Sequence, residues 1–188
     1  MSPLKTIGAC LGGLLLLPVF VISAVAGGSE DLSAASDGSQ QAPVDGAEPG
    51  GLETAVLFNP SIHLRPAARG DIEAGLVDPR VLQVLLLLAQ THELQGVGPF
   101  VSGHSYYVKG TAQVSNHVSG RAVDIGAVDG QAVSPANQAA HEVMETILAL
   151  PSPYLPDELG GPWLLRAGPV RVFTEGHSDH IHIGFDSR

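Results

Sequence analysis

The chain contains a single cysteine, Cys10, among its 188 residues. An internal disulfide framework and a cysteine-based zinc finger are therefore both excluded. Basic residues are also scarce, since nine Lys and Arg stand against 19 Asp and Glu, a formal net charge of −10. This charge disfavours binding to phosphate backbones, so we expect no nucleic-acid partner. Charged residues make up only 15% of the chain, against about a quarter in ordinary soluble domains, which indicates a segment outside any water-soluble fold.

An uncharged apolar run near the amino terminus accounts for part of this deficit. It covers 20 residues, Ile7 to Ala26, and is long enough to cross a bilayer core as a helix. That length favours an uncleaved signal anchor, because secretory apolar regions are usually about 7–15 residues long. Ala24 and Ala26 have the small-x-small form that a signal peptidase accepts, so a cleaved signal peptide stays open. Residues 1–26 are thus predicted to be a signal anchor or signal peptide. In both cases the rest of the chain is extracytoplasmic, either anchored to the membrane or secreted.

The composition changes after this run and again near residue 53. Residues 27–52 are rich in Gly, Ser and acidic residues and contain no Lys or Arg. Such a segment cannot bury enough apolar surface to offset the entropy lost on ordering, so we predict a disordered linker. Residues 53–188 are long enough for one hydrophobic core and form the predicted folded domain.

Within residues 53–188 the apolar pattern predicts both helices and strands. Asp78 and Pro79 are a typical helix start, and the helix after them is apolar on all sides and is expected to end near Gly96. A second long helix is expected after Ser134-Pro135, because apolar residues recur there at helical spacing. A short helix is expected at 66–73, strands at 97–102, 122–128, 170–173 and 180–185, and a surface loop at 151–162. With the last two strands as antiparallel neighbours, the pattern predicts an α+β fold, an antiparallel sheet flanked by helices.

Three short segments of the domain carry residues suited to binding a metal ion. A catalytic zinc site needs about three protein ligands, neutral imidazoles and carboxylates, and one open position for water. His117 and Asp124 are seven residues apart across Gly120, and they can converge if the turn folds His117 back over the strand that holds Asp124. In the last predicted strand His180 and His182 point to one face, because side chains alternate along a strand. His182 could therefore complete the ligand set.

These segments are similar to a known family. Ser115-Asn116-His117, Gly120-Arg121-Ala122-Val123-Asp124-Ile125 and Asp179-His180-Ile181-His182 resemble the motifs of the D-alanyl-D-alanine carboxypeptidase and endolysin-type zinc metallopeptidases, which share their fold with the hedgehog signalling domain. The resemblance covers residues 77–185. It implies a hedgehog/DD-peptidase-like fold with Zn²⁺ bound by His117, Asp124 and His182. It also implies that Asp179 acts as base on the zinc-bound water and that His180 steadies the developing oxyanion.

The chain departs from the family at one motif. Family members commonly carry Ser-Gly-Tyr-Arg, whose arginine grips the terminal carboxylate of a peptide, whereas residues 102–105 read Ser-Gly-His-Ser. The missing arginine therefore favours cleavage inside a stem or cross-link peptide over carboxypeptidase action. Arg121 or Lys109 could supply a cation instead, His104 could line the pocket, and Ser115 could orient a ligand from behind.

The sequence therefore predicts a zinc metallopeptidase, of carboxypeptidase or endopeptidase type, that hydrolyses peptidoglycan peptides at the cell envelope. The expected partners are peptidoglycan stem or cross-link peptides and, through the N-terminal segment, a membrane; the expected state is a monomer. Two alternatives stay open: a zinc-bearing cell-wall binding module without catalysis, and an envelope protein in which zinc only holds the fold together.

Overall fold

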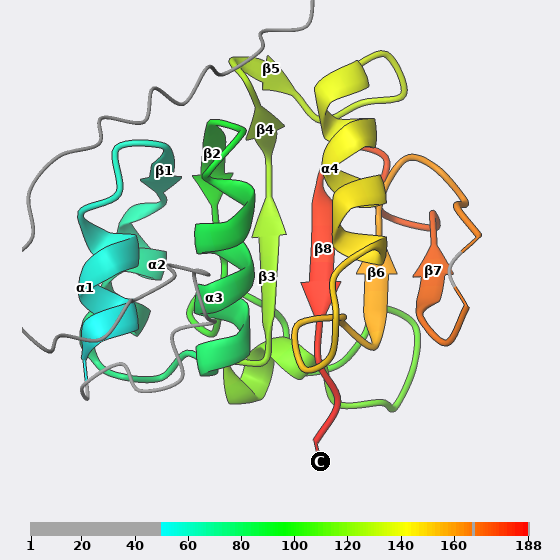
Figure 1. Cartoon of the computed structure of the whole chain (residues 1–188). Helices are drawn as coiled ribbons and strands as arrows, with labels where there is room; N and C mark the ends of the chain where they lie inside the picture. The colour runs from blue at the N-terminus through cyan, green and yellow to red at the C-terminus, as the bar shows by residue number, and fades with distance from the viewer. Residues whose placement is uncertain (1–49, 167, 188) are drawn as a thin grey trace, which may run out of the picture. The chain divides into compact units, whose positions relative to one another are not determined.

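The computed structural model describes residues 50–166 and 168–187 (Figure 1). The expected signal segment, residues 1–26, and residues 27–49 of the expected linker lie outside the described residues. Within the described ranges, no helix combines the length and apolar character needed to cross a membrane. Residues 51 and 52, expected to end the linker, belong to the first helix.

The described part of the chain is α+β, as the sequence predicts. Its α-helices are α1 (Gly51–Leu57), α2 (Pro66–Glu73), α3 (Pro79–Leu88) and α4 (Gln138–Leu148). Its strands are β1 (Ile62–Leu64), β2 (Leu94–Val97), β3 (Ala122–Ile125), β4 (Ala127–Val128), β5 (Gln131–Ala132), β6 (Glu158–Gly160), β7 (Arg171–Phe173) and β8 (Ile181–Gly184). A short 3-10 turn, η1 (Asn116–Ser119), precedes β3.

The strands form two four-stranded sheets, in the orders β1-β2-β4-β5 and β3-β8-β6-β7. Both sheets are mixed, which corrects the expectation of an antiparallel sheet, because β1 pairs with β2 and β6 with β7 in parallel. The chain passes through α2 and α3 between β1 and β2, a long connection of the kind that parallel strands need. β6 lies between β7 and β8, so the two expected neighbours do not pair. β3 and β4 follow one another along the chain and join the two sheets (Figure 1).

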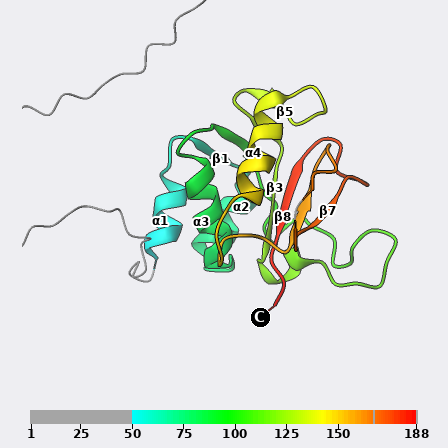
Figure 2. The ribbon, with the colours of Figure 1, turned by 45° about the vertical axis from the view of Figure 1, so that its right-hand side comes forward.

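Two helices cover one face of these strands (Figures 1 and 2). α3 begins where the sequence predicts, with Pro79 in its first turn and the Asp78 carboxylate accepting a hydrogen bond from the backbone N–H of Arg80 at 2.9 Å. It ends at Leu88 and not near Gly96, because the chain turns at residues 89–91 and enters β2 at Leu94. α4 begins three residues after Pro135, with Asn137 as its N-cap.

The alternation of side chains on β3 and β8 divides these strands between the core and the opposite face. Val123, Ile125, Ile181 and Ile183 are fully buried in the hydrophobic core with the apolar faces of α3 and α4. Because neighbouring residues of a strand point to opposite faces, the residues between them face away from the helices. That second face carries the polar residues that the sequence singles out.

Candidate metal centre

A single helical turn positions His117. Ser115 precedes η1, and its hydroxyl oxygen accepts a hydrogen bond from the backbone N–H of His117 at 3.4 Å. Gly120 ends the turn in the left-handed conformation, with φ of 67°, where a Cβ would overlap the carbonyl oxygen of Leu76. The cap and the glycine together fold His117 back over β3. Ser115 thus orients the predicted ligand His117 through the backbone.

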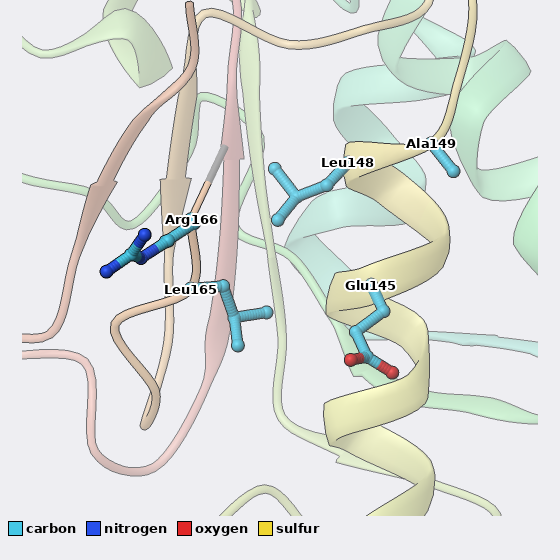
Figure 3. A pocket seen from close by; sticks show the side chains of 5 residues that line it. All are labelled: Glu145, Leu148, Ala149, Leu165 and Arg166. Atoms are coloured by element: carbon cyan, nitrogen blue, oxygen red, sulfur yellow. The ribbon is translucent and has the colours of Figure 1, made fainter. Parts of the chain in front are cut away.

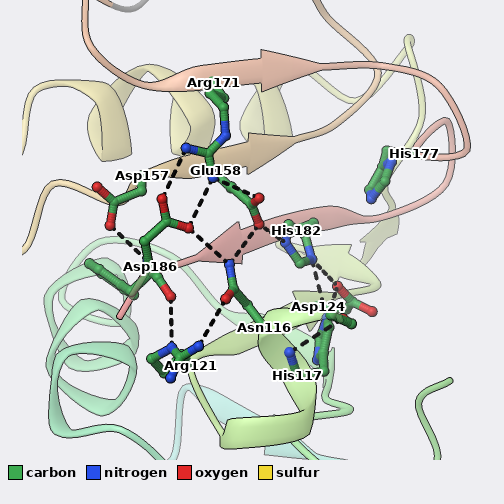
Figure 4. Close-up of polar contacts among 12 residues, drawn as sticks. Asn116, His117, Arg121, Asp124, Asp157, Glu158, Arg171, His177, His182 and Asp186 are labelled. Carbon is green, nitrogen blue, oxygen red and sulfur yellow. Dashed lines mark hydrogen bonds and ion pairs between the residues drawn. The ribbon is translucent and has the colours of Figure 1, made fainter. Parts of the chain in front are cut away.

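Strand pairing brings the other two predicted ligands together. Asp124 on β3 and His182 on β8 are directly opposite one another in the antiparallel register. His182 Nδ1 lies 3.1 Å from Asp124 Oδ1, His117 Nε2 lies 3.2 Å from His182 Nδ1, and His117 Nε2 lies 3.4 Å from Asp124 Oδ1 (Figure 4). In a tetrahedral zinc site with bonds of 2.0–2.1 Å, neighbouring ligand atoms are about 3.3 Å apart. The three side chains thus meet in a triangle of the right size for one metal ion.

The outward-facing nitrogen of each histidine has an oxygen acceptor. His117 Nδ1 lies 3.0 Å from the carbonyl oxygen of Phe100, to which it donates. His182 Nε2 lies 3.6 Å from Glu158 Oε2. A Cβ at position 184 would lie only 2.8 Å from that carboxylate oxygen, so the glycine at this position leaves room for Glu158 beside His182. When a metal ion is bound, such acceptors favour the tautomer whose inward nitrogen carries the lone pair, as in metal-ligating histidines.

Burial makes this arrangement costly unless a cation occupies it. The side chains of His117, His182 and Asp124 are only 1%, 10% and 14% exposed. Burial raises the pKa of Asp124, but hydrogen bonds with His117 and His182 outweigh it and hold that pKa far below its usual value. Burial lowers the pKa of His182, but the hydrogen bond with Asp124 and the nearby carboxylate of Glu158 raise it to about 9. The site favours a positive charge beside Asp124, which a proton or a metal ion can supply.

His104 joins this group from a loop. Its ring stacks on that of His117 with centroids 3.9 Å apart and planes 14° apart. Single ligand atoms of His104, His117 and Asp124 all lie within 4.8 Å of one another, and the three could hold a metal ion. His117 and Asp124 therefore belong to two overlapping sets, completed by His182 in one and by His104 in the other.

The two residues predicted to move protons lie beside the triangle in different ways. His180 directs Nε2 toward the site, 4.0 Å from Asp124 Oδ1. Its Nδ1 lies 2.8 Å from Asp179 Oδ1, a contact that lowers the pKa of Asp179. The side chain of Asp179 is 82% exposed. His180 therefore stands nearer the triangle, and Asp179 contacts it from the solvent side.

A comparison of the chain with protein-family models, with curated proteins and with solved structures finds no match in any of the three.

His177 is a further neighbour of the triangle. Its ring lies over Gly160, where a Cβ would be only 2.9 Å from the His177 Cγ atom, and it packs edge-on against Phe173. The ring centroid lies 4.7 Å from that of His180 and 5.5 Å from that of His182. The absence of a side chain at Gly160 makes this packing possible, and no pattern in the sequence around His177 indicates it.

Arg121 and Lys109 were the predicted substitutes for the missing arginine. Arg121 Nε donates to the carbonyl oxygen of Phe185 at 3.1 Å, and its Nη2 donates to Asn116 Oδ1 at 3.3 Å. These bonds tie its guanidinium to the fold, on the side of Asn116 away from the triangle (Figure 4). Lys109 is exposed in the loop that also carries His104.

A polar network behind His182 was not foreseen from the sequence. Glu158 accepts from Arg171 Nη2 at 2.8 Å and from Asn116 Nδ2 at 3.0 Å, and Arg171 also binds Asp186 at 3.0 Å (Figure 4). The nearby His182 ring, followed by the hydrogen bonds from Arg171 and Asn116, lowers the pKa of Glu158 to about 2 despite burial. Glu158 lies in the stretch predicted as a proline-rich loop, where no motif marks it.

A hollow lies on the helix side of the fold (Figure 3). It is lined by Glu145, Leu148, Ala149, Leu165 and Arg166. Its polar side chains are one carboxylate and one guanidinium, with no histidine, cysteine or hydroxyl that could act as a nucleophile. The histidine face is therefore the candidate functional site.

Proposed function

We propose that this protein is a zinc-dependent peptidase with a hedgehog/DD-peptidase-like fold that hydrolyses peptide bonds of peptidoglycan at the cell envelope. The observation that carries the proposal is the triangle formed by His117 Nε2, Asp124 Oδ1 and His182 Nδ1, with all three distances between 3.1 and 3.4 Å. These are the three residues that the resemblance to the zinc metallopeptidases singles out as ligands, in the same order along the chain.

The donor set fits zinc better than a hard cation. Two imidazole nitrogens and one carboxylate oxygen suit Zn²⁺, whereas Mg²⁺ and Ca²⁺ prefer sites made of oxygen atoms. The acceptors behind His117 and His182 hold both rings in the ligating tautomer. Zinc bound here would bring a water molecule of lowered pKa and would polarise the scissile carbonyl group.

His180 and Asp179 would then handle the proton as a pair. His180 Nε2, on the side of Asp124, accepts the proton of the attacking water, and Asp179 stabilises the resulting imidazolium through Nδ1. The protonated ring next donates to the tetrahedral oxyanion and delivers the proton to the leaving amine. This assigns to His180 the base role that the resemblance gives to Asp179, because the carboxylate of Asp179 faces the ring and solvent.

The surroundings favour cleavage within a peptide over removal of a terminal residue. The motif position of the carboxylate-binding arginine is filled by Ser105. The nearby guanidinium of Arg121 is engaged by Phe185 and Asn116. A substrate with a free terminal carboxylate would therefore lack the arginine that binds it in the family, whereas an internal bond of a stem or cross-link peptide needs no such partner.

The test is mass analysis of peptidoglycan fragments after incubation with the purified full chain and zinc. We expect new amino termini, loss of the activity with a chelator, and no activity in Asp124→Ala. His63→Ala is the matched control, because His63 pairs with Glu93 on the surface at 2.7 Å, in a histidine–carboxylate contact unconnected with the triangle. Full activity in Asp124→Ala would overturn the proposal.

His104 favours a second candidate, a zinc-bearing binding module without catalysis. If a third imidazole completes the coordination, the site has four protein ligands and is closed, as in structural zinc sites. Binding of peptidoglycan fragments without release of new amines would support this candidate over the peptidase.

A further inference from the structure

The loop that carries His104 is an exposed arm over the histidine face. Residues 102–114, here called the arm, are all exposed and form the green loop on the right of Figure 2. A hairpin-like bridge between Tyr107 and Val114 closes the arm on itself. Few core contacts hold such a segment, so its displacement costs little compared with unfolding the domain.

The base of the arm is fixed at a definite place. The carboxylate of Asp71, which is 2% exposed, accepts hydrogen bonds from the backbone N–H groups of Val101 and Ser102 at 3.0 and 2.9 Å and from the Ser102 hydroxyl at 2.6 Å. Gly103 follows in a left-handed conformation, with φ of 91°. The anchored base and the turn place residue 104 beside His117 while the rest of the arm stays in solvent.

We propose that His104 is a displaceable fourth ligand of the metal ion bound by His117, Asp124 and His182. Single ligand atoms of His104, His117 and Asp124 lie within 4.8 Å of one another. In its stack on His117 the His104 ring directs its nitrogens parallel to those of His117, so it must turn out of the stack to reach the common metal ion. His104 Nδ1 donates to the carbonyl oxygen of Ser105 at 2.8 Å, which leaves Nε2 with a lone pair. This inference rests on the metal site of the proposed function.

The remaining gap is small. The ligand atom of His104 lies within 4.8 Å of those of His117 and Asp124, against about 3.3 Å between ligands in a tetrahedral zinc site. A shift of less than about 2 Å in the exposed arm, together with a turn of the His104 ring out of its stack on His117, closes this difference. The resting site then holds three imidazoles and one carboxylate, and a peptide substrate must displace His104 to reach the metal.

The coordination can be counted directly. X-ray absorption of the zinc-loaded full chain should show three imidazoles in the native protein and two in His104→Ala. We also expect His104→Ala to bind zinc about tenfold more weakly in chelator competition and to cleave peptides at least as fast as the native protein. His177→Ala is the matched control, because it removes a neighbouring ring of the same face and should leave the count at three.

The outcomes separate this inference from the proposed function. Two imidazoles in the native protein, or an unchanged count in His104→Ala, would overturn the fourth ligand while the peptidase proposal stands. Three imidazoles without peptide cleavage, in the native protein and in His104→Ala, would support the ligand and refute the peptidase. If His104→Ala does not fold, the imidazole count of the zinc-loaded native protein decides: three imidazoles support the fourth ligand and two overturn it.

Discussion

The carboxylate of Glu158 offers a sharp test of the metal centre, because it acts on the site without being a ligand. Glu158→Gln keeps the size of the side chain and removes its charge. The carboxylate lies 3.6 Å from His182 Nε2 and stabilises the tautomer whose Nδ1 faces the triangle. An amide accepts a hydrogen bond less strongly than a carboxylate does, so Nδ1 becomes a poorer ligand and the protein should bind zinc more weakly.

The size of the effect follows from the contacts of Glu158. Loss of a partner behind a metal-ligating histidine typically weakens metal binding about 10–100-fold, or about 1.4–2.8 kcal/mol. Arg171 and Asn116 donate hydrogen bonds to the same carboxylate and partly neutralise its charge, so its effect on His182 is weaker than that of a free carboxylate. We therefore expect a loss near the lower limit, about tenfold in the dissociation constant of zinc.

The assay is competition with a chelating indicator, at one pH and ionic strength, for the native chain and the variant. Glu93→Gln is the control, because Glu93 faces His63 at 2.7 Å on the surface, with side chains 48% and 52% exposed, and should leave zinc affinity unchanged. Thermal unfolding of the metal-free proteins separates a loss of affinity from a loss of fold. Native zinc affinity in a folded Glu158→Gln variant would refute this account of how His182 is held.

Three further predictions concern the arm, the turn and the proton pair. Burial raises the pKa of Asp71, but hydrogen bonds from Ser102 and the backbone outweigh this effect and lower it below the usual 3.8. The stability that the carboxylate contributes is therefore present above pH 3.8 and is lost as the pH falls. In urea unfolding, Asp71→Asn should be less stable than the native protein at pH 7, and its stability should depend less on pH between about pH 5 and about pH 2. Gly110 has a φ of 77° and open space around it, so Gly110→Ala should lower the free energy of unfolding in urea by about 1 kcal/mol. In Gly120→Ala the new Cβ would also overlap the carbonyl oxygen of Leu76, so the loss should exceed about 3 kcal/mol. Equal losses in the two variants would contradict the close approach of Gly120 to Leu76. His180→Ala should lower kcat about 100-fold or more at unchanged zinc content, and Asp179→Asn should lower it less; the reverse order would return the base role to Asp179.

The sequence carries those parts of the fold that depend on local pattern. The helix start at Asp78 and Pro79 is predicted from the capping preferences of these residues. The alternation of side chains in β8 predicts that His182 points to the face of the sheet opposite to that of Ile181. The turn at Gly120 is visible in the spacing of His117 and Asp124. These signals each span fewer than ten residues and need no knowledge of which strand lies beside which.

The remaining features depend on partners that are distant along the chain. β6 is only three residues long and lies in a proline-rich stretch, so neither the mixed sheet nor the position of Glu158 behind His182 could be inferred. The stacking of His104 on His117 and the packing of His177 over Gly160 are tertiary contacts without a sequence pattern. Residues that touch the predicted ligands were thus harder to find than the ligands themselves.

The two-sided character of β3 and β8 has a consequence for how this chain can vary. An insertion or deletion of one residue within either strand would place a neighbouring isoleucine or valine where Asp124 or His182 now lies. The same change would therefore remove a predicted metal ligand and expose an apolar core residue. The exposed arm, residues 102–114, is under no such joint constraint apart from His104. Natural variants should therefore differ in the length of the arm and keep the spacing within both strands.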